Sequence, residues 1–503
     1  MSTGALKNPR SLPDLPDEVL TLIFDHLFDE QRAQAEPGCY RRKYNRPTAY
    51  STLYALARSC RRLYDVAKEV FEQKCVWEFR HPVAAFIQGT DPEPNHDLHR
   101  DCRHIEILRD ARVYDRPEYQ GRSQEELEAG LATREDWPAD VQTTLEQDPA
   151  QIELALLVAR SPNLQTFIMD GLHERFGSST SYELPVWLYP IIQVARDIPV
   201  SSTDNPFYHN LRTLDLHMQY TCTPSMAYLF LLPALRALRL SGMNSRGQFD
   251  AEANWPVQNR SSLVDTLILY EVDIPDELAR LLITSCRELS RFEYDHNRNS
   301  VQTRSTRLVG IMSALEQQQD SLRILRLDPH EDDLMDQDDL TYARIDGFHK
   351  LHALQRLSTP FRTLLGRPPL GYTGEGSWQY PQIRDIIPRR LQELSLYMTP
   401  TMISREYHDG YQGLFFSALP SQAKDVHLKK VCVDYEHMST SASSLPFNFW
   451  DIKNAYMEHG VAFDYSISAE PESLGTSTLH SSPSIDSVLS WCVMSAAMGK
   501  RCA

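Results

Sequence analysis

The densest group of potential metal ligands in the sequence lies in the segment 96–104, HDLHRDCRH, which holds three histidines and one cysteine. Imidazole nitrogen and thiolate sulfur are the ligands that zinc prefers in proteins. The spacing of these residues, however, matches no zinc module. Residues 103–108, RHIEIL, alternate as a β-strand does, which would place Cys102 and His104 in a strand context. We therefore interpret this segment as structural and predict no metal site.

Two other segments have the composition of a ligand-binding loop. The acidic run 328–339, DPHEDDLMDQDD, could hold a divalent ion or a basic peptide, but it lacks the spaced ligands and central glycine of a calcium loop. Residues 371–376, GYTGEG, invite comparison with a phosphate-binding loop, but no Gly-Lys-Ser/Thr follows them. We interpret both segments as solvated surface loops.

Motifs of catalysis are missing from the sequence. It contains no G-x-S-x-G nucleophile elbow, no H-E-x-x-H zinc motif, no P-loop, and no cysteine with a nearby histidine in a recognisable catalytic context. We therefore expect a protein that is not an enzyme and that needs no cofactor. The alternative is an enzyme of an uncharacterised kind, housed in the segment 110–149 or in the loop 371–376.

A basic segment, residues 38–62, contains arginines and lysines interleaved with tyrosines and has no acidic residue. Such a pattern is compatible with an RNA or phosphate patch or with a nuclear import signal. We favour a solvated basic loop that meets an acidic partner. The net charge of −17 and the isoelectric point near 5.5 argue against wholesale binding of nucleic acid or of acidic membranes.

Length and composition indicate a multi-unit intracellular protein. With 503 residues, 42% hydrophobic and 24% charged, the chain is globular and too long for one compact core. Its nine cysteines include no C-x-x-C pair, which is typical of free thiols in a reducing compartment. The longest apolar run, 227–235, is far shorter than the roughly 20 residues of a membrane span. We expect the cytoplasm, the nucleus or both.

Two helical patterns near the N-terminus must be positioned by the rest of the chain or by a partner. Residues 15–27, LPDEVLTLIFDHL, place a broad apolar stripe on one side of a helix, with Pro16 at its start and two acidic residues in its first turn. A second run, 53–70, repeats apolar residues at helical spacing. Two helices of this size bury little surface alone, so another surface is expected to cover them.

These two runs together resemble an F-box, the module by which substrate receptors bind the Skp adaptor of cullin-RING (SCF) ubiquitin ligases. The resemblance covers roughly residues 12–71 and is carried by LPDEVL, the following IF and L, and LARSCRRL. It departs from the family where Leu63 replaces a frequent tryptophan and where the connection 28–52 is longer than usual. The resemblance implies that the adaptor-binding residues are Leu15, Pro16, Val19, Leu20, Ile23, Leu27, Leu56, Cys60 and Leu63.

A short phrase, L-x-x-L-x-L, recurs from residue 151 onward. It occurs at 164–169, 211–216, 235–240, 322–327 and 391–396, and more loosely at 264–269, 289–294, 354–357, 423–428 and 461–463. Helical patterns lie between the copies, at 152–159, 228–232, 276–285, 308–318 and 451–459. The spacing of the copies is close to, or somewhat longer than, the 20 to 29 residues of leucine-rich repeats.

The recurring strand and helix predict an α/β solenoid, because each unit has an apolar edge that only its neighbour can cover. Parallel strands would lie inside and helices outside. The region resembles the leucine-rich-repeat regions of fungal-type F-box proteins, although the usual asparagine of the repeat turn is mostly missing. A compact α/β domain is the alternative. We predict an F-box domain at 1–80, a first strand and charged insertion at 81–150, the solenoid at 151–467, and a serine-rich tail with a short apolar end segment at 468–503.

Residues between the buried leucines of each strand are the candidates for binding, because side chains alternate along a strand. They combine both charges with aromatic rings, as protein-recognition surfaces often do. The alternative for any one of them is a solvated sheet residue without a role. The candidates are Asp215, His217, Arg239, Tyr270, Glu293, Arg326 and Tyr397, with Asp170 and His427 as further members.

Taken together, these features predict a substrate-recognition subunit of an SCF ubiquitin ligase. The F-box resemblance implies binding to the Skp adaptor and, through it, to the cullin, while the solenoid would hold a target protein for ubiquitin-dependent degradation. The alternative is a scaffold of the same architecture that holds partners without their ubiquitination. Neither the target nor a requirement for its phosphorylation follows from the sequence.

Overall fold

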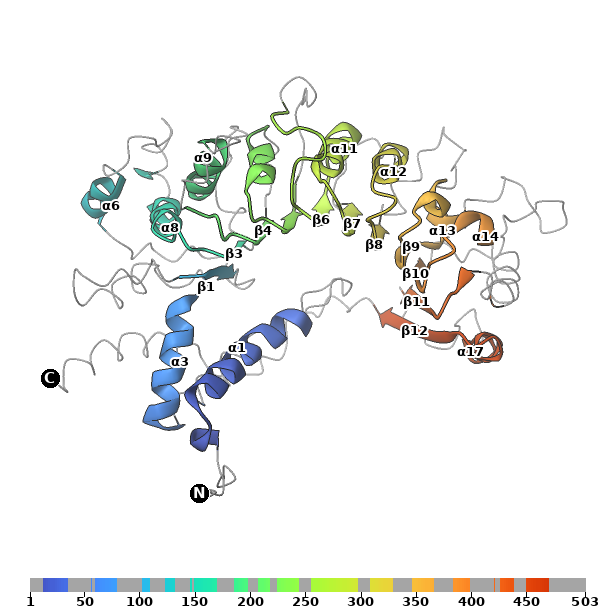
Figure 1. Ribbon diagram of the computed structural model, residues 1–503, viewed down its shortest axis with the longest axis horizontal. Coiled ribbons are helices and arrows are strands. Elements are labelled where there is room, and N and C mark those ends of the chain that lie inside the picture. Colours follow the sequence, from blue (N-terminus) through green and yellow to red (C-terminus); the bar gives the residue numbers. More distant parts are fainter. Residues whose placement is uncertain are drawn as a thin grey trace, which may run out of the picture. The chain divides into compact units, whose positions relative to one another are not determined.

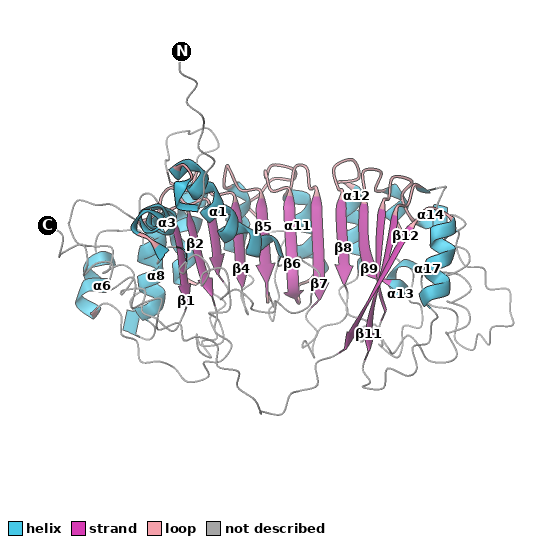
Figure 2. Ribbon diagram, turned by 90° about the horizontal axis from the view of Figure 1, so that it is seen from below, coloured by secondary structure: helices cyan, strands magenta, loops and turns pink. Residues whose placement is uncertain are grey.

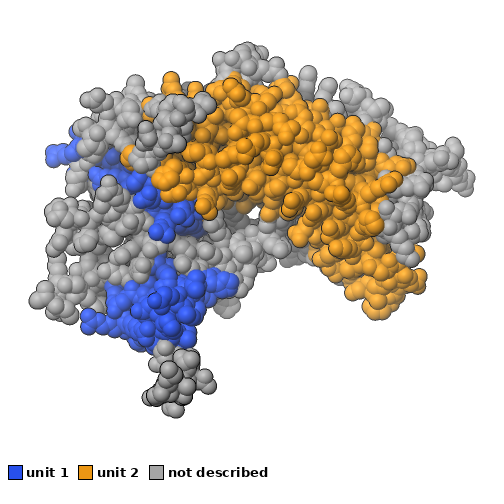
Figure 3. All heavy atoms as spheres, in the orientation of Figure 1, with its two compact units in different colours: residues 1–167, 480–503 blue, residues 168–479 orange. Residues whose placement is uncertain are grey.

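A computed structural model describes residues 12–34, 56, 59–78, 102–108, 123–131, 145–146, 149–169, 185–197, 207–217, 224–243, 255–296, 308–328, 346–365, 383–398, 420, 426–437 and 449–469. The chain divides into two compact units, coloured separately in Figure 3: unit 1 comprises residues 1–167 and 480–503, and unit 2 comprises residues 168–479. The loop 371–376, most of the acidic run and the tail after residue 469 lie outside the described residues.

Unit 1 begins with two helices that share one apolar core. A 3-10 turn, η1 (Leu12–Asp14), leads into α1 (Asp17–Gln34), and α3 (Arg61–Gln73) packs against α1. The first turn of α1 is acidic, which suits the positive end of the helix dipole. The second run predicted at 53–70 is interrupted, because Cys60 is not helical and the continuous helix starts one residue later. The core consists of Leu20, Phe24, Leu63, Val66, Ala67 and Val70.

The strands of unit 1 are parallel. β1 (Lys74–Glu78) follows α3 without a break and pairs with β2 (His104–Leu108), with Lys74 opposite His104. The strand predicted at 103–108 is thus confirmed, whereas β1 was not predicted. The amides of Gln165 and Thr166 donate to the carbonyl of Arg103 at 2.8 and 3.0 Å, where β3 (Thr166–Met169) begins. Two helices complete the unit's described elements, α6 (Gln124–Leu131) and α8 (Pro149–Ala159).

Unit 2 is an α/β solenoid. Its parallel strands are hydrogen-bonded in the order in which they occur along the chain, from β4 to β12. The strands are β4 (Thr213–His217), β5 (Ala237–Ser241), β6 (Thr266–Val272), β7 (Arg291–His296), β8 (Ile324–Asp328), β9 (Arg356–Pro360), β10 (Glu393–Met398), β11 (Lys430–His437) and β12 (Ala462–Ala469).

Helices and 3-10 turns cover one side of this sheet. Figures 1 and 2 show the helices of unit 2 along the outer side of its curved row of strands, as the sequence predicts. The helix predicted at 228–232 is a 3-10 helix, η4 (Pro224–Leu231). The others are η3 (Val186–Leu188), α9 (Tyr189–Asp197), α11 (Asp276–Ser285), α12 (Leu308–Glu316), η6 (Phe348–Lys350), α13 (Phe361–Leu365), α14 (Ile383–Ile386) and α17 (Phe449–Glu458).

One buried row of apolar side chains runs through all strands of unit 2. Its members face each other across every strand pair and are at most 2% exposed. In strand order, the row comprises Leu214, Leu238, Leu267, Phe292, Leu325, Leu357, Leu394, Val431 and Phe463. These side chains are buried on the side of the sheet that the helices cover. Their burial removes apolar surface from water, and this holds neighbouring units together.

One predicted copy of the phrase is wrong in its position. The looser copy at 423–428 predicts a strand there, but the strand is β11 and its residue in the buried row is Val431. Val426 is buried in the turn before the strand, and His427 is exposed there with a φ of 54°. The alternation KVCVDY, with its β-branched residues, is the stronger strand signal.

The starts of the strands from β5 to β11 repeat the same backbone geometry. Two consecutive amides at the start of one strand donate to a single carbonyl before the previous strand; Arg236 and Ala237, for example, both donate to Arg212 at 2.9 Å. The same pair of bonds recurs before β6, β7, β8, β9, β10 and β11. This repetition fixes the register between units.

Among the described residues, no helix is both long enough and apolar enough to cross a membrane.

Candidate binding surfaces

The first candidate surface is an apolar flank of α1, which we define as Pro16, Val19, Leu22 and Ile23. These residues recur three and four apart and so lie along one side of the helix. Val19 is 38% exposed and Leu22 is 68% exposed, while Ile23 is half-buried. Because these apolar residues are contiguous along one side of α1, they form a candidate docking surface.

The residues predicted for adaptor binding fall into two groups. Leu20 and Leu63 are at most 1% exposed and form the core between the helices, so in this structure they hold α1 against α3 and present nothing to a partner. Leu15, Leu27, Leu56 and Cys60 are partly buried against that core. Pro16, Val19 and Ile23 belong to the α1 flank. Sequence reasoning missed Leu22. It could have been found as an apolar residue that lies outside the stripe of the helix that faces the core.

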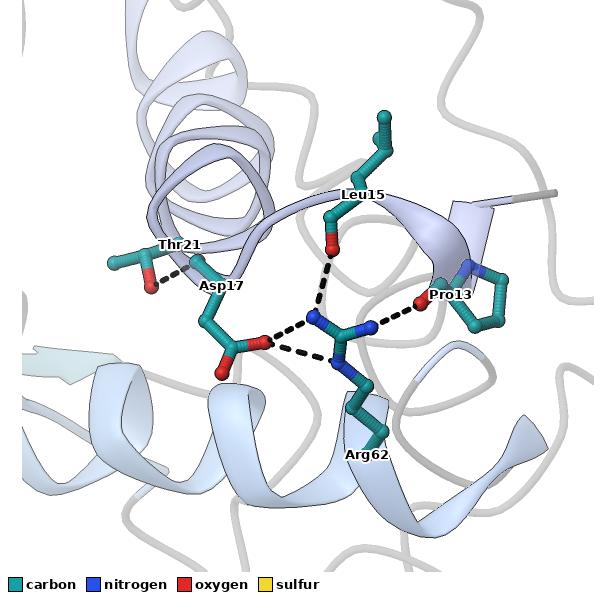
Figure 4. Close-up of polar contacts among 5 residues, drawn as sticks. All are labelled: Pro13, Leu15, Asp17, Thr21 and Arg62. Atoms are coloured by element: carbon teal, nitrogen blue, oxygen red, sulfur yellow. Dashed lines mark hydrogen bonds and ion pairs between the residues drawn. The ribbon is translucent and has the colours of Figure 1, made fainter. Parts of the chain in front are cut away.

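A clasp around Arg62 fixes the entry to α1, and Figure 4 shows its guanidinium between the backbone of η1 and the side chain of Asp17. The Nη1 group donates to the carbonyl of Pro13 at 2.7 Å, and Nη2 donates to the carbonyl of Leu15 at 2.9 Å. Nε and Nη2 both donate to Asp17 Oδ1, at 3.0 and 2.8 Å. Thr21 Oγ1 donates to the carbonyl of Asp17 at 2.9 Å.

The second candidate surface is the side of the unit 2 sheet opposite the buried row, which we call the strand face. All seven predicted residues lie on it, because each is an odd number of positions from the buried residue of its strand. Asp215, Arg239, Glu293 and Arg326 share one row across the strands. His217 and Tyr270 lie in the next row, opposite Ser241 on β5, and Tyr397 lies two residues further along β10 than Ser395.

The structure brings the candidates on β4, β5 and β6 into one cluster. Arg239 Nε lies 3.8 Å from Asp215 Oδ1, and the Arg239 guanidinium lies over the ring of Tyr270, 5.3 Å from its centroid. His217 Nδ1 is 3.2 Å from the hydroxyl of Ser241. Gly242 makes this packing possible, because a Cβ there would lie 2.8 Å from His217 Cε1.

A second cluster surrounds Arg326. Its guanidinium lies over the ring of Tyr397, 5.3 Å from the centroid, and the Tyr397 hydroxyl is 2.6 Å from the hydroxyl of Ser358. Glu293 accepts a hydrogen bond of 2.6 Å from Arg291 Nε on the same strand. Glu293 and Arg326 are 6% and 7% exposed, so these charges are largely withdrawn from water. Two arginine–tyrosine stacks, on β5/β6 and on β8/β10, thus recur along the strand face.

The electrostatic environment keeps both stacked tyrosines protonated. Burial raises the pKa of Tyr270 to about 12, and the carboxylates of Glu271 and Asp295 add to this shift while Arg239 and Arg326 oppose it. Burial likewise raises the pKa of Tyr397 to about 12, against the opposing effect of Arg326 and of the Ser358 hydrogen bond. The two hydroxyl groups therefore act as neutral donors or acceptors over the whole physiological range.

Several strand-face residues were missed by sequence reasoning. Asp295 and Asp328 stand opposite each other near the ends of β7 and β8 and are 5% and 7% exposed. On the last strands, Lys430 Nζ lies 3.0 Å from Asp464 Oδ2, and Ser466 donates a hydrogen bond to Asp434. Each of these residues lies an odd number of positions from the buried residue of its strand, as the predicted residues do. The same alternation of side chains could therefore have identified them.

The group of metal-ligand types around Cys102 is a buried polar cluster. His104 Nε2 lies 3.4 Å from Glu106 Oε2, and the Cys102 thiol donates to the carbonyl of His104 at 3.5 Å. Within the described ranges, no three histidine, cysteine or carboxylate side chains are arranged so that they could hold a metal ion. Asp170 lies outside the described residues, and His427 lies in a turn and off the strand face.

No protein-family model matches the chain, and no curated protein matches it either. What the geometry offers is two surfaces of different chemistry on two separate units, an apolar helix flank on unit 1 and a charged and aromatic strand face on unit 2.

Proposed function

We propose that the protein is the substrate-recognition subunit of an SCF ubiquitin ligase, and that the α1 flank binds the Skp adaptor. The observation that carries this proposal is the exposure of Val19 and Leu22 on a helix whose core-facing residues, Leu20 and Phe24, are buried. This flank lies directly after the Leu15-Pro16 start through which the segment resembles an F-box. An adaptor that buries the flank removes apolar surface from water, which favours association.

The strand face of unit 2 is proposed to bind the target protein. It carries arginine and tyrosine, the residue types that most often dominate the energy of protein interfaces, on a regular sheet. Arg239, Tyr270 and Tyr397 are half-buried, whereas Arg326 is 7% exposed and lies behind the ring of Tyr397 as its stacking partner. Because Arg239 and Arg326 are stacked on neighbouring rings, part of their side-chain entropy is lost before a partner arrives. A surface held in this way loses less side-chain entropy when it binds a partner.

The chemistry of ubiquitin transfer is assigned to other subunits of the ligase. The protein would raise the effective concentration of the target near the ubiquitin-charged enzyme, and such a receptor needs no catalytic group, metal or cofactor of its own. We propose the cytoplasm or nucleus as its location, where the adaptor and cullin would meet it.

Co-purification with the Skp adaptor and cullin tests the α1 flank. We expect wild type to bind and a Val19→Asp/Leu22→Asp variant to lose binding, because both carboxylates would have to leave water in the contact. Both side chains are exposed, so the variant should fold. Ala129→Asp, which adds a carboxylate at an exposed position of α6 in the same unit, is the control for added charge and should bind as wild type does.

The proposal is wrong if the wild-type chain, folded and in excess, does not bind the adaptor. It is equally wrong if the Val19→Asp/Leu22→Asp variant binds with unchanged affinity, because the contact would then lie elsewhere. Circular dichroism and thermal unfolding of each variant establish that a loss of binding is not a loss of fold.

A further inference from the structure

Arg62 makes more contacts to the start of α1 than an ordinary surface ion pair requires. Its side chain is 47% exposed and that of Asp17 is 64% exposed, so the ion pair alone contributes little to stability. The guanidinium, however, also donates to two backbone carbonyls, those of Pro13 and Leu15. These carbonyls belong to the turn that leads into α1, and they lie on both sides of Asp14.

The geometry is specific for arginine. Three acceptors at different positions are bound by one planar group, which arginine can do because its five N–H donors point in fixed directions. Lysine carries the same charge on a single nitrogen and cannot reach this arrangement. The clasp therefore fixes the direction of the turn and does more than supply a positive charge.

The position of the clasp in the chain explains what it is needed for. Arg62 and Asp17 are 45 residues apart in sequence, so the clasp joins two segments that are distant along the chain. The core below involves Leu20 and Phe24, one turn and more into the helix. Leu12 and Leu15 are only partly buried against that core, and the clasp adds polar restraints to the same turn.

We propose that Arg62 is a positioning residue for adaptor binding: it holds η1 and the first turn of α1 so that Pro16, Val19 and Leu22 form one fixed apolar surface. This inference rests on the proposed function. A preorganised surface binds more tightly because the ordering cost is met before association. Loss of the clasp leaves the core intact, but the surface must then become ordered on binding, which makes the free energy of adaptor binding less favourable.

Adaptor affinity and amide hydrogen exchange, measured on the full chain, test the inference. The variants are Arg62→Gln and Arg62→Lys, with Arg61→Gln as a matched control, since Arg61 is the exposed neighbour. We expect both Arg62 variants to bind the adaptor about tenfold more weakly, which corresponds to the loss of one charge-assisted hydrogen bond. The amides of Leu15, Val19 and Leu20, which donate to Leu12 and Pro16, should exchange faster. Those of Val66 and Val70 in α3 should not change.

A second pair of variants separates positioning from direct contact between Arg62 and the adaptor. Asp17→Ala removes the side-chain acceptor of Arg62 and leaves the arginine itself in place, and it should weaken adaptor binding in the same direction. Glu18→Gln is its control, because it removes the neighbouring acidic group from the same helix turn without touching the clasp. If Asp17→Ala speeds exchange at the Leu15 and Val19 amides and yet binds like wild type, while Arg62→Gln binds weakly, Arg62 contacts the adaptor directly and the positioning role is refuted.

The remaining outcomes distinguish the two proposals. Unchanged affinity in both Arg62 variants overturns the positioning role and leaves the proposed function standing. Faster exchange throughout α1 and α3, with a lowered unfolding temperature, would show that Arg62 only stabilises the fold. Failure of the wild-type chain to bind the adaptor overturns both the proposed function and the positioning role of Arg62, whatever the exchange experiment gives.

Discussion

Arginine stacked on tyrosine is the recurring residue-scale feature of the strand face. Arg239 lies over Tyr270 and Arg326 lies over Tyr397, each 5.3 Å from the ring centroid. A cation held over an aromatic ring is stabilised by about 0.5 to 2 kcal/mol, with the larger values at desolvated sites. Arg326 is the more buried of the two, so we expect its stack to be the more rigid.

The two stacked tyrosines predict a pH dependence of stability. Both have pKa values raised to about 12 from the ordinary value of 10, so the folded state binds their protons more tightly than the unfolded state does. Their contribution to stability is therefore complete below pH 10 and is lost as pH rises from 10 to 12. Denaturant unfolding across this range should show a fall that is smaller in Tyr270→Phe and Tyr397→Phe. Equal slopes in all three chains would contradict the prediction.

At the scale of residues, the sequence predicts which side chains lie on the strand face, but it does not predict which of them contact each other. Strand parity places Arg239 and Tyr270 on one face without further information. Their contact depends on the register between β5 and β6, which places Arg239 opposite Ile268 and Ser241 opposite Tyr270. For the same reason the sequence could not distinguish Leu20, which is buried, from Val19, which is exposed, before the position of α3 was known.

At the scale of elements, Gln318 connects one strand–helix unit to the next. It follows α12, is 1% exposed, and lies against the end of α11 and the approach to β7. Its Oε1 accepts from the amide of Leu289 at 3.0 Å, and its Nε2 donates to the carbonyl of Cys286 at 2.9 Å. A buried side chain thus satisfies two backbone groups of the preceding unit, which would otherwise be buried without partners.

Replacement of Gln318 should loosen this junction. In Gln318→Leu the Leu289 amide and the Cys286 carbonyl lose their partners, and we expect the free energy of unfolding to fall by about 3 kcal/mol. Hydrogen exchange at the Leu289 amide should accelerate more than at the neighbouring strand amides. Gln317→Ala changes an exposed side chain one residue away and should leave both quantities near wild type. Unchanged exchange at Leu289 would show that the bond is not formed in solution.

Elements with a clear apolar phrase were predictable, and the exceptions have physical reasons. β1 follows α3 directly and contains only five residues, KCVWE, so no turn or loop marks its start. β11 carries Val431 and Val433 where the phrase expects leucines, and the nearby VHL of residues 426–428 drew the prediction to the wrong place. In both cases the β-branched valines and the parallel neighbour decide the strand.

At the scale of the whole molecule, the two candidate surfaces lie on separate compact units. Their chemistry also differs, since the α1 flank is apolar and the strand face is charged and aromatic. Binding of an adaptor and binding of a target therefore draw on different residues, and a change in one surface should leave the other functional.

This separation predicts variants that trap a target. The Val19→Asp/Leu22→Asp chain should lose the adaptor and keep partners of the strand face, whereas Arg239→Ala/Tyr270→Ala should keep the adaptor and lose such partners. Affinity purification from cells measures both, and pulse-chase labelling measures the lifetime of each shared partner. A longer lifetime with the first variant identifies a degradation target. An unchanged lifetime identifies a scaffold that holds its partner without ubiquitination.

Parallel strands in chain order make the strand face collinear with the sequence of unit 2. Each additional strand advances the surface by about 4.8 Å, and the residues on either side keep their own neighbours. A gain or loss of one strand–helix segment between β6 and β8 would therefore change the distance between the Arg239–Tyr270 and Arg326–Tyr397 stacks without altering either stack. The spacing of two binding positions and their chemistry can thus vary independently.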